Sequence, residues 1–85
     1  MNELVFDRDF LDDLAWWVAR DRKTALKIFE LIEAIRRDAC SGLGKPEPLK
    51  HLGGGTWSRR ITQEHRLVYR VVGSRLLFAQ ARYHY

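Results

Sequence analysis

The residues best suited to chemistry lie in the second half of the chain, and the densest group is W-S-R-R-I-T-Q-E-H-R-L-V-Y at residues 57–69. This stretch predicts a strand, a turn and a strand that carry five charged or titratable side chains: Arg59, Arg60, Glu64, His65 and Arg66. A charge that leaves water costs free energy unless it is paired, so we expect one face of this hairpin to be open to a ligand. The alternative is a solvated sheet face that binds nothing.

A second candidate is Glu47, which lies between Pro46 and Pro48 in the segment G-K-P-E-P-L-K-H at residues 44–51. The two prolines fix the backbone on both sides of the glutamate and forbid helix. The carboxylate is therefore expected on a stiff, extended arm, which suits an acid or a base. Spacing alone does not distinguish this interpretation from a solvated loop glutamate.

The chain ends in R-Y-H-Y, which sets His84 between two tyrosines. The alternative to a site residue is a terminal histidine that only caps a strand. His51 and His65 are interpreted as supporting or solvated residues. The three histidines and the lone Cys40 do not have the spacing of metal ligands, so we expect no metal and no other cofactor.

Charge is divided unevenly along the chain. Residues 1–43 carry seven Lys or Arg and nine Asp or Glu, a net −2, whereas residues 44–85 carry eight and two, a net +6. A small protein polarised in this way attracts a polyanion from a distance, and salt weakens the attraction. The division indicates nucleic acid or an acidic protein as the partner.

Length and composition are those of one globular domain over residues 1–85, with 46% apolar and 31% charged residues. The longest apolar run, residues 14–19, is too short to span a bilayer, and the N-terminal residues lack the pattern of a signal peptide. We expect a cytoplasmic protein that does not bind membranes.

Two helices are predicted in the first half, after a short strand at residues 4–6. Asp7 is the expected N-cap of the first helix, which ends near Arg20. The second begins after Asp21, carries a Glu33–Arg37 pair and is stopped by Gly42. A tight turn between them makes the helices antiparallel.

Strands are expected at residues 57–61, 65–72 and 76–83, with Gly73 and Ser74 as a hairpin turn. This order predicts an α+β fold, in which a short N-terminal strand and two antiparallel helices accompany a mainly antiparallel sheet, with the helices on one sheet face.

Three motifs together resemble a known family. G-K-P-E-P-L-K-H, W-S-R-R-I-T-Q-E-H-R-L-V-Y and the terminal R-Y-H-Y are similar to those of the YoeB (Txe/YoeB) family in the RelE/ParE-type superfamily of toxins. The resemblance covers the whole chain in length and element order and is strongest over residues 44–85. It implies a ribosome-dependent mRNA endonuclease with a RelE-like, microbial ribonuclease-like fold and no metal. It also implies a toxin of a type II toxin–antitoxin system that a YefM-like antitoxin neutralises.

Metal-free cleavage of RNA needs a base for the ribose 2′-hydroxyl, an acid for the departing 5′-oxygen and positive charge for the phosphorane. The resemblance implies that Glu47 is the base, His84 the acid and Arg66 the cation. The products would be a 2′,3′-cyclic phosphate and a 5′-hydroxyl. It further implies contacts to substrate from these residues: phosphate contacts from Lys50 and Arg60, an orienting role for Glu64, and base stacking or phosphate placement by Tyr85.

Strand register tests this assignment. If Gly73 and Ser74 form a two-residue turn, Val72 pairs with Arg75, and an unbroken ladder then points His84 away from the face that carries Arg66. We therefore predict a bulge in the last strand, a longer turn, or terminal residues that leave the sheet.

Two other functions remain open. A non-catalytic basic module that binds RNA or an acidic protein explains the charge division but not the carboxylate between prolines. A toxin of the same fold that poisons gyrase would not need Glu47, Arg66 and His84 together. A homodimer is compatible with the sequence, which locates no interface for it.

Overall fold

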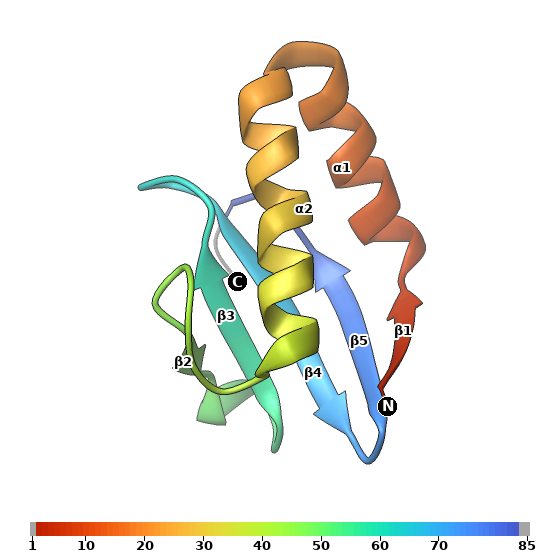
Figure 1. Ribbon diagram of the computed structural model, residues 1–85, viewed down its shortest axis with the longest axis vertical. Helices are drawn as coiled ribbons and strands as arrows, with labels where there is room; N and C mark the ends of the chain where they lie inside the picture. Colours follow the sequence, from red (N-terminus) through yellow and green to blue (C-terminus); the bar gives the residue numbers. More distant parts are fainter. Residues whose placement is uncertain (1, 84–85) are drawn as a thin grey trace.

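The computed structural model describes residues 2–83, in which two helices lie against one face of a five-stranded sheet (Figure 1). The strands are β1 (Glu3–Phe6), β2 (Glu47–Pro48), β3 (Thr56–Arg60), β4 (Arg66–Val72) and β5 (Arg75–Gln80), in the spatial order β1-β5-β4-β3-β2. Only β1 runs parallel to its neighbour, β5, and the other pairs in this part of the chain are antiparallel. The predicted α+β class and the mainly antiparallel sheet are confirmed.

The helices are α1 (Arg8–Arg20) and α2 (Arg22–Arg37). An aspartate precedes each as its N-cap, as predicted. The Asp7 side chain accepts a hydrogen bond from the Asp9 backbone N–H at 3.2 Å, and Asp21 accepts one from Thr24 at 3.1 Å. Each bond satisfies a backbone donor that the first helical turn leaves without a partner. Neither helix is long and apolar enough to cross a bilayer.

Two predictions about the end of α2 are wrong. The helix ends at Arg37, before Gly42, because Asp38 adopts an extended backbone and its side chain accepts bonds from the Cys40 N–H and the Ser41 hydroxyl. A short polar side chain that bonds the following backbone ends a helix in this way. Glu33 pairs with Arg36, three residues on, where we expected Arg37.

The core lies between the two helices and the sheet face that they cover. Apolar side chains from every layer are fully buried there: Phe10 from α1, Ile28, Leu31 and Ile35 from α2, and Leu67, Tyr69, Leu76 and Phe78 from the sheet. Phe6 of β1 stacks on Phe78, with ring centroids 4.9 Å apart, so β1 also directs its aromatic ring to the helix side.

One face of the hairpin was expected to be open to a ligand, and Arg59 is not on it, since it is 0% exposed on the helix side of the sheet. Its guanidinium donates hydrogen bonds to the carbonyl oxygens of Asp38 (2.6 Å), Ser41 (2.9 Å) and Leu43 (2.9 Å), and to the hydroxyl of Tyr69 (3.2 Å). These acceptors replace the water that the charge loses on burial. Arg59 therefore holds the loop that follows α2.

The predicted irregularity of the last strand is a β-bulge. Val72 pairs with Arg75 as expected, but Tyr69 pairs with Phe78 and Val68 with Gln80, so Ala79 is an extra residue. β5 ends at Gln80, earlier than expected, and the Arg66 N–H then bonds the carbonyl of Tyr83 at 3.0 Å. Beyond the bulge, each residue of β4 therefore faces a residue one position later in the chain than an unbroken ladder would give.

The proline-flanked segment is extended only in part. Glu47 and Pro48 form β2 at the sheet edge, which confirms the extended arm, whereas Lys50–Leu52 forms a short 3-10 helix, η1. The helix is compatible with the prolines because it begins beyond Pro48. β3 and β4 also differ slightly from prediction, since His65 precedes β4 and Ile61 follows β3.

Candidate active site

The sheet face away from the helices, called the outer face below, brings several of the predicted site residues together. Successive side chains of a strand alternate between faces, and Arg59 points to the helix side, so Ser58 and Arg60 belong to the outer face. Glu47 is the register partner of Ser58, and Ser58 is the partner of Val68. Glu47 thus lies on the outer face, one strand from β3.

Arg66 reaches the same point from the neighbouring strand. Its Nη1 donates to the hydroxyl of Ser58 at 3.4 Å, and its direct partner across the ladder is Arg60. Ser58 is therefore the shared neighbour of Glu47 and Arg66. Like charges directly opposite each other destabilise a sheet, and an anion bound between Arg60 and Arg66 would relieve that repulsion.

The other predicted site residues flank this group. Lys50 is exposed at the start of η1, which follows β2 directly. Glu64 is exposed in the turn between β3 and β4, at the end of the ladder where Arg60 and Arg66 pair. His84 and Tyr85 lie outside the described residues.

Sequence reasoning missed the contacts that hold the C-terminal tail. Ala81 is fully buried, and its backbone forms two hydrogen bonds with side chains of α1. Its carbonyl accepts a bond from Trp17 Nε1 at 2.7 Å, and its N–H donates one to Asp13 at 2.9 Å. Two residues on, the N–H of Tyr83 donates to Nδ1 of His65 at 2.7 Å. These three contacts, which we call the tail clamp, fix the chain immediately before His84.

Aromatic packing supports the tail clamp. His65 packs edge-on against Trp17, with centroids 4.9 Å apart, and the Arg82 guanidinium lies 3.8 Å from the ring centre of Trp16. No spacing in the sequence indicates these contacts, because they join residues far apart in the chain. The adjacent Trp16 and Trp17 are a sequence signal for this region, and both contact the core, since Trp17 is buried in it and Trp16 packs against it.

Burial and hydrogen bonds change acidities on the helix side of the sheet. Burial raises the pKa of Tyr69, although the hydrogen bond from Arg59 acts in the opposite direction. The hydrogen bond from Ser41 lowers the pKa of Asp38, and the bond from the Cys40 N–H adds to it. Within residues 2–83, no three His, Cys, Asp or Glu side chains are grouped as metal ligands would be.

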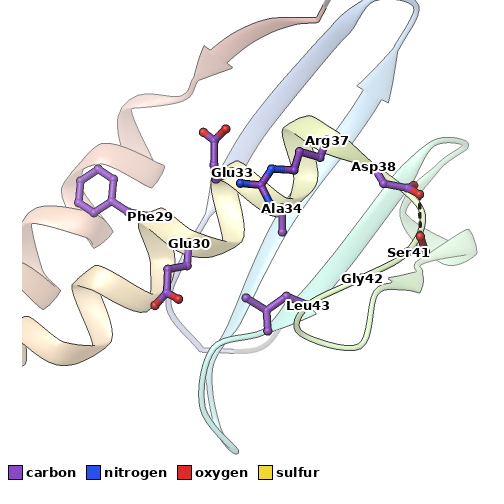
Figure 2. Close-up of a pocket in the computed structure, with 9 residues that line it drawn as sticks. All are labelled: Phe29, Glu30, Glu33, Ala34, Arg37, Asp38, Ser41, Gly42 and Leu43. Atoms are coloured by element: carbon purple, nitrogen blue, oxygen red, sulfur yellow. Dashed lines mark hydrogen bonds between the residues drawn. The ribbon is translucent and has the colours of Figure 1, made fainter.

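A larger hollow than the recesses of the sheet, about 620 Å³, lies elsewhere. It lies between α2 and the loop after it, and its lining includes Phe29, Glu30, Glu33 and Leu43 (Figure 2). Figure 2 shows the two glutamates projecting from α2, with Leu43 on the loop. Carboxylates disfavour a polyanion, so size alone is a poor guide here and the outer face is the better candidate site.

Comparison with known proteins identifies the family of this chain. Residues 6–85 match the family model for YoeB-like toxins of bacterial type II toxin–antitoxin systems. The Toxin YoeB of Mycobacterium bovis is 52% identical over 85 residues, which is 100% of each chain. The solved YoeB/ParE toxin from Agrobacterium tumefaciens is 49% identical with a TM-score of 0.91, again over 100% of each chain.

Chains from two solved assemblies of a relative are also similar to this chain. A chain of the YoeB dimer from Staphylococcus aureus is 40% identical to this chain, with a TM-score of 0.89. The match covers 99% of this chain and 98% of that one. A chain of the heterotetrameric YoeB–YefM toxin–antitoxin complex from the same organism has a TM-score of 0.85 at 38% identity, covering 100% of this chain and 99% of that one. Family model, full-length identity and fold agree, and this chain belongs to the YoeB-like toxins of bacterial type II toxin–antitoxin systems.

Proposed function

We propose that this toxin is an endoribonuclease that cleaves mRNA in the ribosomal A site and so inhibits translation. The observation that carries the proposal is the convergence of Glu47 and Arg66 on Ser58, on an outer face that also presents Arg60. A carboxylate beside a fixed guanidinium is what attack by a 2′-hydroxyl on a phosphate requires.

The reaction is a displacement at phosphorus. Glu47 takes the proton of the ribose 2′-hydroxyl, the 2′-oxygen forms a bond to phosphorus, and the bond from phosphorus to the 5′-oxygen breaks. His84 gives its proton to the departing 5′-oxygen. The products are a 2′,3′-cyclic phosphate and a 5′-hydroxyl, and the proton count balances without a metal or other cofactor.

Charge accumulates on the phosphorane oxygens during this step, and Arg66 is the group that stabilises it. The Ser58 hydroxyl orients the guanidinium through the bond at 3.4 Å. Arg60 and Lys50 bind neighbouring phosphates, Glu64 orients one of these basic groups, and Tyr85 stacks on a base or places the scissile phosphate. Removal of one such electrostatic donor typically lowers kcat by about 10²–10³-fold.

The tail clamp supports the role of His84. A general acid contributes only when it is held within hydrogen-bond reach of the leaving group. Because the clamp fixes Ala81 and Tyr83, it limits where the next residue can go. We assign the clamp residues to positioning, with no direct part in the chemistry.

A YefM-like antitoxin is the proposed protein partner, since the S. aureus relative is solved in complex with YefM. We propose that an acidic segment of the antitoxin covers the basic outer face, blocks access of RNA and stabilises the toxin by binding only its folded state. A homodimer is proposed from the S. aureus YoeB dimer, and the site of action is the cytoplasm, where ribosomes translate.

The deciding experiment maps mRNA ends by primer extension on translating ribosomes. Wild type should create new 5′ ends inside A-site codons, and Glu47→Ala and His84→Ala should abolish them. Glu30→Ala, an exposed glutamate on α2, is the matched control and should cleave as wild type does. Wild-type binding without new ends would reject the nuclease in favour of a binding module.

A further inference from the structure

The outer face extends beyond the candidate active site in a second row of side chains. Thr56 of β3 pairs with Arg70 of β4, Arg70 with Leu77 of β5, and Leu77 with Val5 of β1. This row runs across the sheet parallel to the one through Ser58 and Val68. The two rows are separated by two residues on β3 and β4, which is about 7 Å, and by three on β5, where the bulge adds Ala79.

At the β1 end of this second row the surface is hollowed. A recess of about 270 Å³ is lined by Val5, Asp7, Arg70, Leu77, Phe78 and Ala79. It adjoins the bulge at Ala79, and bulges are frequent beside active sites, where they alter which side chains face the ligand. Its lining is mostly apolar, with one cation and one carboxylate.

We propose that this recess binds a nucleobase of the mRNA close to the scissile phosphate. The inference rests on the proposed nuclease function and adds a subsite to it. Val5, Leu77 and Ala79 offer apolar surface to the flat faces of a base, and the guanidinium of Arg70 can stack on the base or contact its phosphate.

The charge of the face argues for RNA as the occupant. Arg60 and Arg66 project from the outer face at the active site and Arg70 projects from it at the recess, so a phosphate backbone that spans the two would meet cations at both ends. An RNA strand that runs along this path would place one nucleotide beside Arg66 and another, further along, over Leu77. The recess therefore continues the path of the backbone.

Asp7 predicts which bases fit best. One of its carboxylate oxygens accepts from the Asp9 N–H at 3.2 Å, and a carboxylate has further acceptor positions for a ligand donor. Adenine, guanine and cytosine present an exocyclic amine to such an acceptor, whereas uracil flanks its single donor with two carbonyl oxygens. We infer a preference for bases that carry an amine.

The test combines a base deletion with protein variants. Ribosome-bound mRNAs carry one abasic nucleotide at each position in turn around the scissile phosphate, and kcat and KM are measured for wild type, Leu77→Thr and Arg70→Gln. Val18→Thr, an exposed apolar residue on α1, is the control. Thermal melting checks the folding of each variant, and Arg70→Gln keeps the test valid if Leu77→Thr does not fold, since Arg70 is exposed.

For wild type and Val18→Thr, loss of the base at one position should raise KM about 10-fold with little change in kcat. In Leu77→Thr and Arg70→Gln the intact mRNA should already bind about 10-fold more weakly, and the same base deletion should cost nothing more. Equal penalties in all four proteins would overturn the subsite and leave the nuclease standing. Absence of cleavage by wild type would overturn the nuclease itself.

Discussion

Arg59 and Arg60 are neighbours in β3 and have opposite surroundings. Arg59 is 0% exposed and bonds three loop carbonyls and a tyrosine hydroxyl, whereas Arg60 is exposed on the outer face, opposite Arg66. The alternation of a strand separates them, so the same residue type supports the fold on one face and, in the proposed function, binds RNA on the other. Charge in a sequence therefore shows its role only after its face is known.

The two faces of the sheet differ in the same way. On the helix side, the buried polar groups of Arg59 and Tyr69 have partners within the fold. On the outer face, Arg60 and Arg66 stand in direct opposition, which is unfavourable without an anion. An anionic ligand bound between Arg60 and Arg66 would therefore be expected to raise the stability of the folded protein.

The largest expected effect is on the helix side. Arg59→Ala leaves three carbonyls without a donor and opens a cavity beside Tyr69, so it should lower the free energy of unfolding by about 3–5 kcal/mol. Arg60→Ala should change it by about 0.5 kcal/mol or less. Urea denaturation measures both. Equal losses would break the distinction between the two arginines.

The next effect is on catalysis. Arg66→Ala should lower the kcat of mRNA cleavage by about 10²–10³-fold, because the phosphorane charge loses its cation. Its urea midpoint should stay close to that of wild type, since the charge that it removes opposes Arg60. Single-turnover cleavage on stalled ribosomes measures the rate. Cleavage within twofold of wild type would remove Arg66 from the site.

Loss of one tail-clamp contact should have a smaller effect on stability and cleavage, which Asp13→Ala and Asp12→Ala test as a matched pair. Asp13→Ala removes the acceptor of the buried Ala81 N–H, and Asp12→Ala removes an exposed carboxylate beside it that pairs with Arg8. An unsatisfied buried donor costs about 1–3 kcal/mol, and the displaced tail should slow cleavage about 10-fold. Asp12→Ala should neither lower the stability in this way nor slow cleavage. If both variants cleave alike, the clamp does not position the tail.

The smallest effect is at alkaline pH. Burial raises the pKa of Tyr69 above its ordinary value of 10.0, so the folded state holds this proton more tightly than the unfolded state does. Its contribution to stability is complete below about pH 10 and is lost as the pH rises through the raised pKa. Tyr69→Phe should therefore show a shallower fall in melting temperature between pH 9 and about pH 11. Tyr83→Phe, at an exposed ring, is the control and should fall as wild type does.

The sequence predicted the parts of this account that depend on local rules. The N-caps Asp7 and Asp21, the Gly73–Ser74 turn and the extended Glu47–Pro48 follow from side-chain and backbone chemistry within a few residues. Alternation, together with the resemblance that brings His84 to Arg66, predicted a bulge, a longer turn or a tail that leaves the sheet, and the structure has a bulge, at Ala79.

The missed features depend on contacts across the fold. The burial of Arg59 requires the loop at residues 38–43 to turn its carbonyls inward, and no pattern near Arg59 reports that. The tail clamp joins Trp17 to Ala81, residues 64 positions apart. Interactions of this kind become visible only when the helices are packed against the sheet.

We propose that a 2′-hydroxyl on the substrate is the nucleophile and that Glu47 activates it. The most direct measurement uses ribosome-bound mRNA with a single 2′-deoxy nucleotide on the 5′ side of the scissile phosphate. Wild-type toxin should leave this strand intact and cleave the all-ribose strand to a 2′,3′-cyclic phosphate. Cleavage of the deoxy-substituted strand at the same position would contradict it.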